Sequence, residues 1–243
     1  GTPLTTYVRE TKILIIEMRN KRSHMEDHTN ILLQVGLNLT EIDTPPEDPT
    51  NLAVSRMNDE SIRHRYSMIC LFRMYLAYIF GEYELAAEMI EVRRNIIKAR
   101  PVRGVTLANE VLLYGLVACV MAQESDPGKW RAIASESVKR MKNMAECSDW
   151  NFEHKYELLK AEMAYRLNGE QEDATVHYDK AIQLAGLHGF INDRAMASEC
   201  AGIFHASTYG PEAAVDYFVK AKQYYSEWGA TRKSLDISNR HHV

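Results

Sequence analysis

The fold is decided by two stretches of the chain, EDATVHYDKAIQLAG at Glu172–Gly186 and PEAAVDYFVKAKQYY at Pro211–Tyr225. Each stretch has an alanine, an aromatic residue four positions on and a second alanine three positions further. These positions are Ala174, Tyr178, Ala181 and, forty residues later, Ala214, Phe218, Ala221. Spacings of four and three fall on one face of an α-helix. A face of this kind that recurs at a fixed interval is typical of stacked antiparallel helix pairs.

The same pattern continues towards the N-terminus in weaker form. Counting back by forty residues from Ala174 gives Ala134, and a further forty-eight give Ala86, which predicts four helix pairs. The set that begins at Ala86 continues with Ile90 and has Arg93 where the second alanine is expected, which weakens this register. We expect an all-α fold, a right-handed solenoid of antiparallel helix pairs with a repeat of about 40 residues.

The domain organisation follows from the proline content. Pro45, Pro46 and Pro49 alternate with acidic residues between Thr40 and Asn51, and such a segment cannot continue a helix. We therefore expect residues 1–57 to form two helices and an acidic loop that pack on the array. Residues 58–243 are expected to form the helical-repeat domain.

Two helices have apolar stripes that predict a single buried face. The first stripe contains Leu107, Val111, Tyr114, Ala118 and Met121. The second contains Phe152, Tyr156, Leu159, Met163 and Leu167. Between these helices, Asp126 followed by Pro127 is a typical helix start, with an N-cap and a proline at the first helical position.

Composition limits the classes of partner. The chain has 243 residues, of which 46% are hydrophobic and 26% charged, so it can bury a substantial core. Its net charge of −4 is small and dispersed, which argues against nucleic acid and anionic membranes as partners. The longest apolar run, Met68–Phe80, is too short for a membrane span and contains Arg73. Gly1 in place of an initiator methionine suggests a piece of a longer protein.

The four cysteines predict a reducing compartment. Cys70, Cys119, Cys147 and Cys200 are far apart, and no two of them have the spacing of a metal or redox site. We expect reduced core residues and a cytoplasmic protein.

Three segments carry a resemblance to a known family. They are EHKYELLKAEMAYRLNGEQEDATVHYDKAIQLAGLHGF at Glu153–Phe190, YYSEWGATRKSL at Tyr224–Leu235 and YLAYIFGEYELAAEM at Tyr75–Met89. They resemble the tetratricopeptide-like helical region of large multi-domain signalling ATPases, which link kinase-like, ATPase, GAF and histidine-kinase domains. The resemblance covers about the last ninety residues well. It implies a tetratricopeptide-like fold and a signalling context, and it implies no particular ligand.

The chain lacks the catalytic motifs of that family. Gly128 and Lys129 are followed by Trp130 rather than serine or threonine, and the earlier glycine of a phosphate-binding loop is missing. Nor does the sequence contain the protein-kinase signatures. We therefore expect a chain that is not an enzyme, with no catalytic residues, no cofactor and no metal.

Five histidines have side chains that could bind a metal ion or serve a structural role. His24 and His28 are four residues apart and could share a helical face to bind a divalent metal, although a solvated polar turn explains them better. His154, His177 and His188 are expected to be structural, each held by a hydrogen bond.

The densest basic cluster is the best sequence candidate for partner binding. It contains Arg93, Arg94, Lys98, Arg100 and Arg103. These residues could bind phosphate or an acidic segment of a partner. The alternative is that they gather near a helix C-terminus, where exposed carbonyls favour cations.

Two further residue sets have structural explanations. Arg73 interrupts an apolar helix and should form an ion pair, with Glu84 or Glu88 as the expected partner. The tyrosines at repeat spacings, Tyr217 among them, are expected to pack in the core.

Two classes of function remain open. In the first, the chain is a non-catalytic interaction and regulatory module that binds a protein, a peptide or a neighbouring domain and relays this binding to attached ATPase or kinase domains. In the second, it is a small-molecule or metal sensor with a pocket between helices. We find no set of nucleophile, base and orienting residue that would favour an enzyme.

Overall fold

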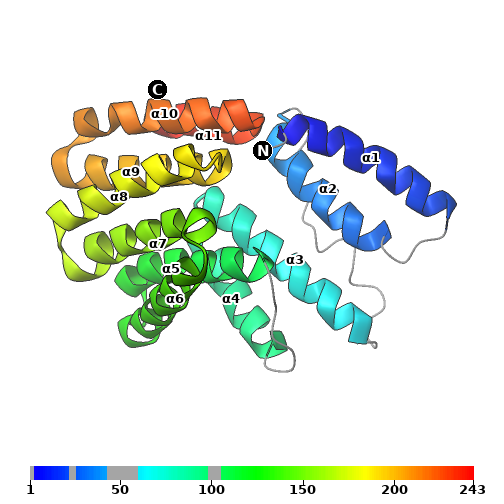
Figure 1. The fold of residues 1–243 in the computed structure, drawn as a ribbon, viewed down its shortest axis with the longest axis horizontal. Coiled ribbons are helices and arrows are strands. Elements are labelled where there is room, and N and C mark those ends of the chain that lie inside the picture. The colour runs from blue at the N-terminus through cyan, green and yellow to red at the C-terminus, as the bar shows by residue number, and fades with distance from the viewer. Residues whose placement is uncertain (1–2, 22–25, 43–59, 98–104) are drawn as a thin grey trace. The chain divides into compact units, whose positions relative to one another are not determined.

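The structure, a computed structural model, describes residues 3–21, 26–42, 60–97 and 105–243. Within these ranges the regular elements are eleven α-helices and one π-helical turn, so the all-α prediction is confirmed (Figure 1). They are α1 (Leu4–Asn20), α2 (Glu26–Thr40), α3 (Glu60–Ile79), α4 (Tyr83–Ile97), α5 (Val105–Glu124), α6 (Pro127–Cys147), α7 (Asp149–Met163), η2 (Ala164–Asn168), α8 (Gln171–Leu187), α9 (Ile191–Tyr209), α10 (Pro211–Trp228) and α11 (Thr231–His241).

The chain divides into two compact units. The α5–α10 unit contains Val102–Tyr225 and Ile237–Val243, and the α1–α4 unit contains Thr2–Pro101 and Ser226–Asp236. This division differs from the boundary between residues 57 and 58 suggested by the sequence, because α3 and α4 group with the N-terminal helices. The last part of the chain contributes to both units.

Helices of the α5–α10 unit pack in sequence order, α5 on α6, α6 on α7, α7 on α8 and α8 on α9. The six residues of the two repeat signatures, Ala174, Tyr178, Ala181, Ala214, Phe218 and Ala221, are all buried. Between α9 and α10, a Cβ atom added at Gly202 would lie only 2.6 Å from the Phe218 ring, so glycine permits this close approach. Pairwise helix packing, as predicted for a helical repeat, is therefore present.

Helix α5 is buried on more sides than its predicted single stripe. Every residue from Glu110 to Ala122 is buried, because α5 contacts α6, α7 and η2. Among the described residues, one stretch, Leu107–Glu124, is long and apolar enough to cross a membrane by length and composition alone. Most of this stretch is buried inside the protein, as is usual for a core helix. A search for uninterrupted apolar runs misses this stretch, because Asn109 and Glu110 interrupt it.

The predicted apolar stripe of α7 is also wrong in part. Leu159 is buried, but Phe152, Tyr156 and Met163 are only half-buried. Four polar residues of the same region are buried instead, namely His154, Lys155, Glu157 and Glu162. A stripe rule that counts only apolar side chains misses this, since paired charges can also be buried.

In the α1–α4 unit, α1 packs on α2, α2 on α3 and α3 on α4. The weakened register that begins at Ala86 is present in the structure, because Ala86, Ile90 and Arg93 are each 0% exposed. Arg93 replaces the second alanine of the signature, and its guanidinium donates hydrogen bonds to the backbone oxygen of Ser67 and, at 2.7 Å, to Ser67 Oγ. The arginine is accommodated because α3 supplies acceptors for its buried charge.

A fully buried lysine joins the C-terminal segment to α3 within the same unit. Lys233 Nζ donates to the backbone oxygen of Ile79 at 2.5 Å and to Asp236 Oδ2 at 2.9 Å, and it lies over the Phe80 ring. Ile79 is the last residue of α3, so the ammonium satisfies a carbonyl that the helix leaves without a partner. In a purely linear array each repeat contacts only its neighbours, and this contact spans a far longer separation in sequence.

Candidate functional site

Three clusters of buried polar residues lie between α7, α8 and α9 in the α5–α10 unit. The first, the Asp193 cluster, joins two residues of α7 to one of α9. His154 Nε2 lies 2.8 Å and Lys155 Nζ 2.5 Å from the same carboxylate oxygen, Asp193 Oδ2. All three side chains are buried, and the His154 ring stacks on Phe190 with 4.6 Å between ring centroids. One carboxylate thus holds two donors inside the unit.

The electrostatics of the cluster fix the protonation states. Burial works against the charged form of Asp193, but the charge of Lys155 and the hydrogen bond from His154 outweigh it and hold the pKa of Asp193 well below its usual range. Burial lowers the pKa of His154, although the neighbouring Asp193 opposes this shift. His154 is therefore neutral at pH 7, with its proton on Nε2. Its buried Nδ1 has no hydrogen-bond partner among the described residues.

The lowered pKa of His154 predicts a loss of stability in acid. Because the folded-state pKa lies below the value of an unfolded histidine, the stabilisation is complete above about pH 6.5 and is lost as the pH falls through the folded-state pKa. The melting temperature between pH 8 and pH 5 should therefore fall more steeply for the wild type than for His154→Gln, which keeps a donor for Asp193 and does not titrate. His205 also has a lowered pKa, but it is present in both proteins and cancels in the difference. Parallel curves would contradict the assignment.

The second cluster surrounds Glu157 of α7. Its carboxylate accepts from His177 Nδ1 at 2.7 Å, from Lys160 Nζ at 2.9 Å and from Lys180 Nζ at 3.0 Å. Burial tends to raise the pKa of Glu157, but the hydrogen bonds from Lys160 and Lys180 lower it below the usual value. The cluster ties α8 to α7.

The third cluster connects α7 to the π-helical turn η2. Glu162 accepts a hydrogen bond from Tyr178 Oη at 2.6 Å and from Arg166 Nε at 2.7 Å. Burial, and then the nearby charge of Glu162, raise the pKa of the Tyr178 hydroxyl well above its usual value. The aromatic residue of the first repeat signature therefore also anchors a buried carboxylate.

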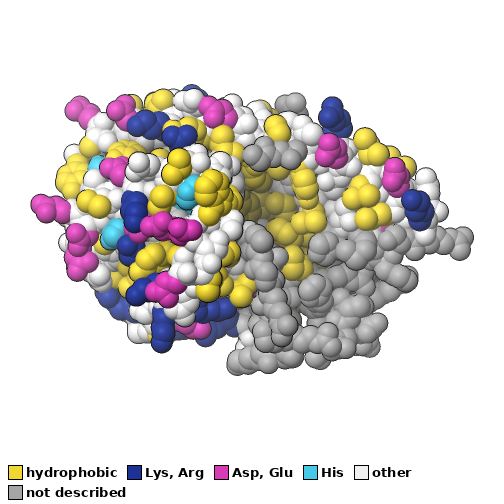
Figure 2. Space-filling view, viewed as in Figure 1, with side chains coloured by type: hydrophobic (Ala, Val, Ile, Leu, Met, Phe, Trp, Pro, Cys, Tyr) yellow, Lys and Arg dark blue, Asp and Glu magenta, His cyan; other side chains and the backbone are white. Residues whose placement is uncertain are grey.

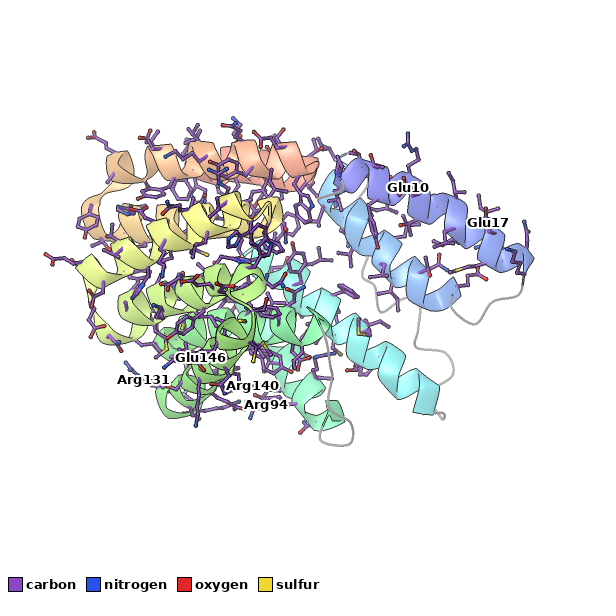
Figure 3. All side chains as sticks on the ribbon, in the orientation of Figure 1. Glu10, Glu17, Arg94, Arg131, Arg140 and Glu146 are labelled. Carbon is purple, nitrogen blue, oxygen red and sulfur yellow. The ribbon has the colours of Figure 1, made fainter. Side chains whose placement is uncertain are left out.

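Other helices satisfy the backbone that the π turn exposes. The backbone oxygen of Leu167 accepts from Arg131 of α6 at 3.0 Å, and that of Arg166 accepts from Gln123 of α5 at 3.2 Å. Arg131 is labelled in Figure 3. A π turn often marks a functional site. Here the backbone oxygens of the turn accept hydrogen bonds from side chains of α5 and α6, so the turn has a structural role.

These clusters hold helices together, and each of their carboxylates is occupied by donors from the chain itself. Within the described ranges, no group of three His, Cys, Asp or Glu side chains is placed to hold a metal ion. The three clusters also contain no Ser or Cys nucleophile beside the histidines. Their chemistry is that of buried ion pairs.

The basic cluster proposed from the sequence is not one surface. Arg93 is fully buried and bonded to Ser67, so its proposed role in partner binding is wrong. Arg94 is half-exposed on α4 and is labelled in Figure 3. Lys98, Arg100 and Arg103 lie outside the described residues. Helical spacing explains why Arg93 is buried and Arg94 is not, because Arg93 lies three positions after the buried Ile90 and so shares its face of the helix.

The structure describes the side chain of neither candidate metal ligand, His24 or His28. His24 belongs to a segment that the structure does not describe, and His28 lies in α2 without a described side chain. Of the three histidines expected to be structural, His154 and His177 have the predicted hydrogen bonds. His188 differs, because its ring stacks on Trp150 at 4.1 Å and its buried Nδ1 has no hydrogen-bond partner among the described residues.

Two other expectations change. Arg73 is half-buried rather than buried and donates to Met89 Sδ at 3.8 Å, while its ion pair with Glu84 or Glu88 stays a prediction. Cys70, Cys119 and Cys200 are buried as predicted, and burial raises the pKa of the Cys70 thiol to about 11. Cys147 is exposed, because it lies at the very end of α6.

Sequence reasoning missed the surface of the α5–α10 unit, where apolar side chains lie between charged ones (Figure 2). Tyr217, predicted to be a core residue, is half-exposed, stacks on His205 at 4.5 Å and donates to Asp179 Oδ1 at 2.8 Å. The sequence could have indicated this exposure, because Tyr217 directly precedes Phe218 and therefore lies off the buried face of α10. Trp150 and Tyr209 are also exposed, by 56% and 51%.

No protein-family model, no curated protein and no solved structure matches this chain. The resemblance to signalling ATPases therefore rests on the quoted residues alone.

Proposed function

We propose that this chain is a non-catalytic helical-repeat module that binds a protein, a peptide or a neighbouring domain of its parent protein. The observation that carries the proposal is a group of large apolar side chains, each more than 40% exposed, on the α5–α10 unit. They are Trp150, Val176, Leu187, Tyr209, Val215 and Val219. Aromatic residues that are held rigid and exposed are typical anchors of protein interfaces.

Two of these side chains are fixed in place by their neighbours. Trp150 stacks on His188, and Tyr209 contacts the rings of Phe204 and His205 at 5.8 and 5.3 Å. Fixed rings lose little conformational entropy when a partner covers them. This favours binding through the surface over a pocket between helices.

The signalling part of the proposal has separate support. The resemblance of Glu153–Phe190 and Tyr224–Leu235 to helical regions of signalling ATPases suggests that partner binding is relayed to attached ATPase or kinase domains. A right-handed arrangement of the helix pairs belongs to the same proposal, as does a cytoplasmic location, for which the dispersed cysteines are the support.

The test compares partner capture by the wild type and by surface variants of the full chain. Trp150→Ala and Tyr209→Ser should each lose partners that the wild type retains, while Gln183→Ala, an exposed polar position on α8, should retain them. Matched circular dichroism spectra and melting temperatures would establish that the variants are folded. A sensor would behave differently, since a metal or small molecule would raise the melting temperature steadily as its concentration rises above the dissociation constant. That result, without any retained partner, would overturn the proposal.

A further inference from the structure

Arg194, near the start of α9, has a half-buried charge to which its own unit offers no acceptor. Its guanidinium carbon lies over the Tyr224 ring of α10, 4.2 Å from the ring centroid. Among the described residues, none accepts a hydrogen bond from this side chain or pairs with its charge, and its Nε is buried. A guanidinium that gives up part of its hydration normally gains acceptors from the protein in return. Arg194 therefore has donors that the unit does not use.

Other cations in the described part of the α5–α10 unit differ from Arg194 in this respect. Each of its other half-buried or buried lysines and arginines has a side-chain nitrogen within 4.0 Å of an oxygen atom of the same unit. These residues are Arg140, Lys155, Lys160, Arg166 and Lys222. The absence of an acceptor at Arg194 is therefore a local feature that needs its own explanation.

Packing holds the guanidinium of Arg194 in place. A Cβ atom added at Gly186, in the last turn of α8, would lie 2.9 Å from both Cζ and Nε of Arg194, so glycine provides the room for this group. The terminal nitrogens are not buried and can donate to an acceptor from outside the unit. A planar guanidinium held between Gly186 and Tyr224 is preorganised to donate two parallel hydrogen bonds to a carboxylate.

Apolar side chains continue from this arginine around the end of α8. Leu187 directly follows Gly186 and is 71% exposed. His188 comes next and stacks on the ring of Trp150, which is 56% exposed. Successive residues of a helix point about 100° apart, so Leu187 lies between the side that contacts the arginine and the side that contacts Trp150. We call this area the α8-end surface, which consists of Trp150, Leu187, His188, Arg194 and Tyr224.

We propose that the α8-end surface binds a segment of a partner protein that has an aspartate or glutamate close to a large apolar side chain. The carboxylate accepts hydrogen bonds from the terminal nitrogens of Arg194, and the apolar side chain packs on Leu187 and Trp150. A free anion such as phosphate would satisfy the arginine but leave both apolar side chains in water, so the combined surface favours a protein segment. This inference rests on the proposed function, since Trp150 belongs to both, and adds the chemistry of the partner.

Selection of random peptides displayed on phage, with the full chain as bait, tests the chemistry of the occupant. The selected peptides should be enriched in aspartate or glutamate close to leucine, phenylalanine or tryptophan. Selected peptides without an acid would overturn the proposal. Selection of no peptide would also overturn it, and binding of inorganic phosphate that depends on Arg194 would then identify a site for free anions. Partner capture that depends on Trp150 could still succeed in either case, so these failures are distinct from failure of the proposed function.

Titration of a selected, fluorescently labelled peptide then tests the role of Arg194. Arg194→Met keeps an unbranched side chain against Tyr224 but removes the donors, and it should weaken binding by about tenfold or more. The matched control is Lys139→Met, which removes the same charge from an exposed position of α6 and should change the dissociation constant by about twofold or less. Equal losses for the two variants would show a general effect of charge and would overturn the proposal.

A change in the peptide completes this comparison. Replacing its acid with the corresponding amide should weaken binding to the wild type, but it should cause no further loss with Arg194→Met, because the two groups act as a pair. Additive losses would show that the acid binds elsewhere on the chain and would overturn the assignment to Arg194.

Gly186→Ala tests the position of the guanidinium without changing its charge. The added methyl group should displace the flexible end of the Arg194 side chain, so the peptide should bind several-fold more weakly. The melting temperature should not fall, since alanine favours a helix more than glycine does. A purely structural role for Arg194 would give the opposite result, with lower melting temperatures for Gly186→Ala and Arg194→Met and an unchanged dissociation constant in both.

Discussion

Replacing Asp193 with alanine should lower the free energy of unfolding by about 3 to 5 kcal/mol. The substitution leaves the Lys155 ammonium and the His154 N–H buried without the carboxylate oxygen that now accepts from both. An unpaired buried charge is among the most destabilising changes that a single substitution can make. Urea denaturation followed by circular dichroism would measure the loss.

A second substitution separates the buried charge from the loss of the side chain itself. In the Asp193→Ala background, Lys155→Met removes the charge that has lost its partner, and it should recover part of the stability. The control is Asp179→Ala, which removes a carboxylate that bonds Tyr217 at the surface and should cost about 1 kcal/mol or less. If Lys155→Met recovered no stability, charge pairing would contribute little to the stability that the cluster provides.

Ala181→Trp and Ala221→Trp should each destabilise the chain by about 1 to 3 kcal/mol or more through overpacking. Both alanines are buried at the second small position of the repeat signature, so the close-packed interior has no room for a larger side chain there. Ala213→Trp, at an exposed position of α10, tests whether tryptophan in a helix is harmful by itself. The melting temperatures of the three variants show whether the loss of stability comes from overpacking at the buried sites or from tryptophan itself. An unchanged value for both buried sites would show that the small positions are not packing positions.

Local sequence signals predicted the helices well because they act over a few residues. Asp126 caps α6 as expected, and its Oδ1 accepts from the Lys129 amide at 3.2 Å. Gly169, which ends the helical stretch after α7, has a φ of +74°, a conformation that favours glycine. Neither feature depends on distant parts of the chain.

Burial was predicted less well, because it depends on which helices meet. Helix α5 has an apolar stripe but is buried all round, since helices contact it on several sides. Arg93 looked like a surface cation because arginine usually is one. Its burial requires the Ser67 backbone oxygen from another helix, which a local pattern cannot indicate.

The polar clusters could not be found from spacing alone for the same reason. His154 and Asp193 are 39 residues apart, and only the packing of α9 on α7 brings them together. His177 and Glu157 depend in the same way on α8. The sequence did indicate that these histidines are structural. It could not indicate which acid each one binds, since several carboxylates were equally possible.

The bond between Lys233 and the end of α3 also affects how the chain can be made. The two residues that form this bond, Ile79 and Lys233, are 154 positions apart in the sequence. At ribosomal rates of about 5 to 20 residues per second, Lys233 is synthesised about 8 to 30 seconds after Ile79. During that interval the last carbonyl of α3 has no lysine to satisfy it. We therefore expect the N-terminal helices to remain accessible to chaperones, or to other nascent chains, until the segment that contains Lys233 has left the ribosome.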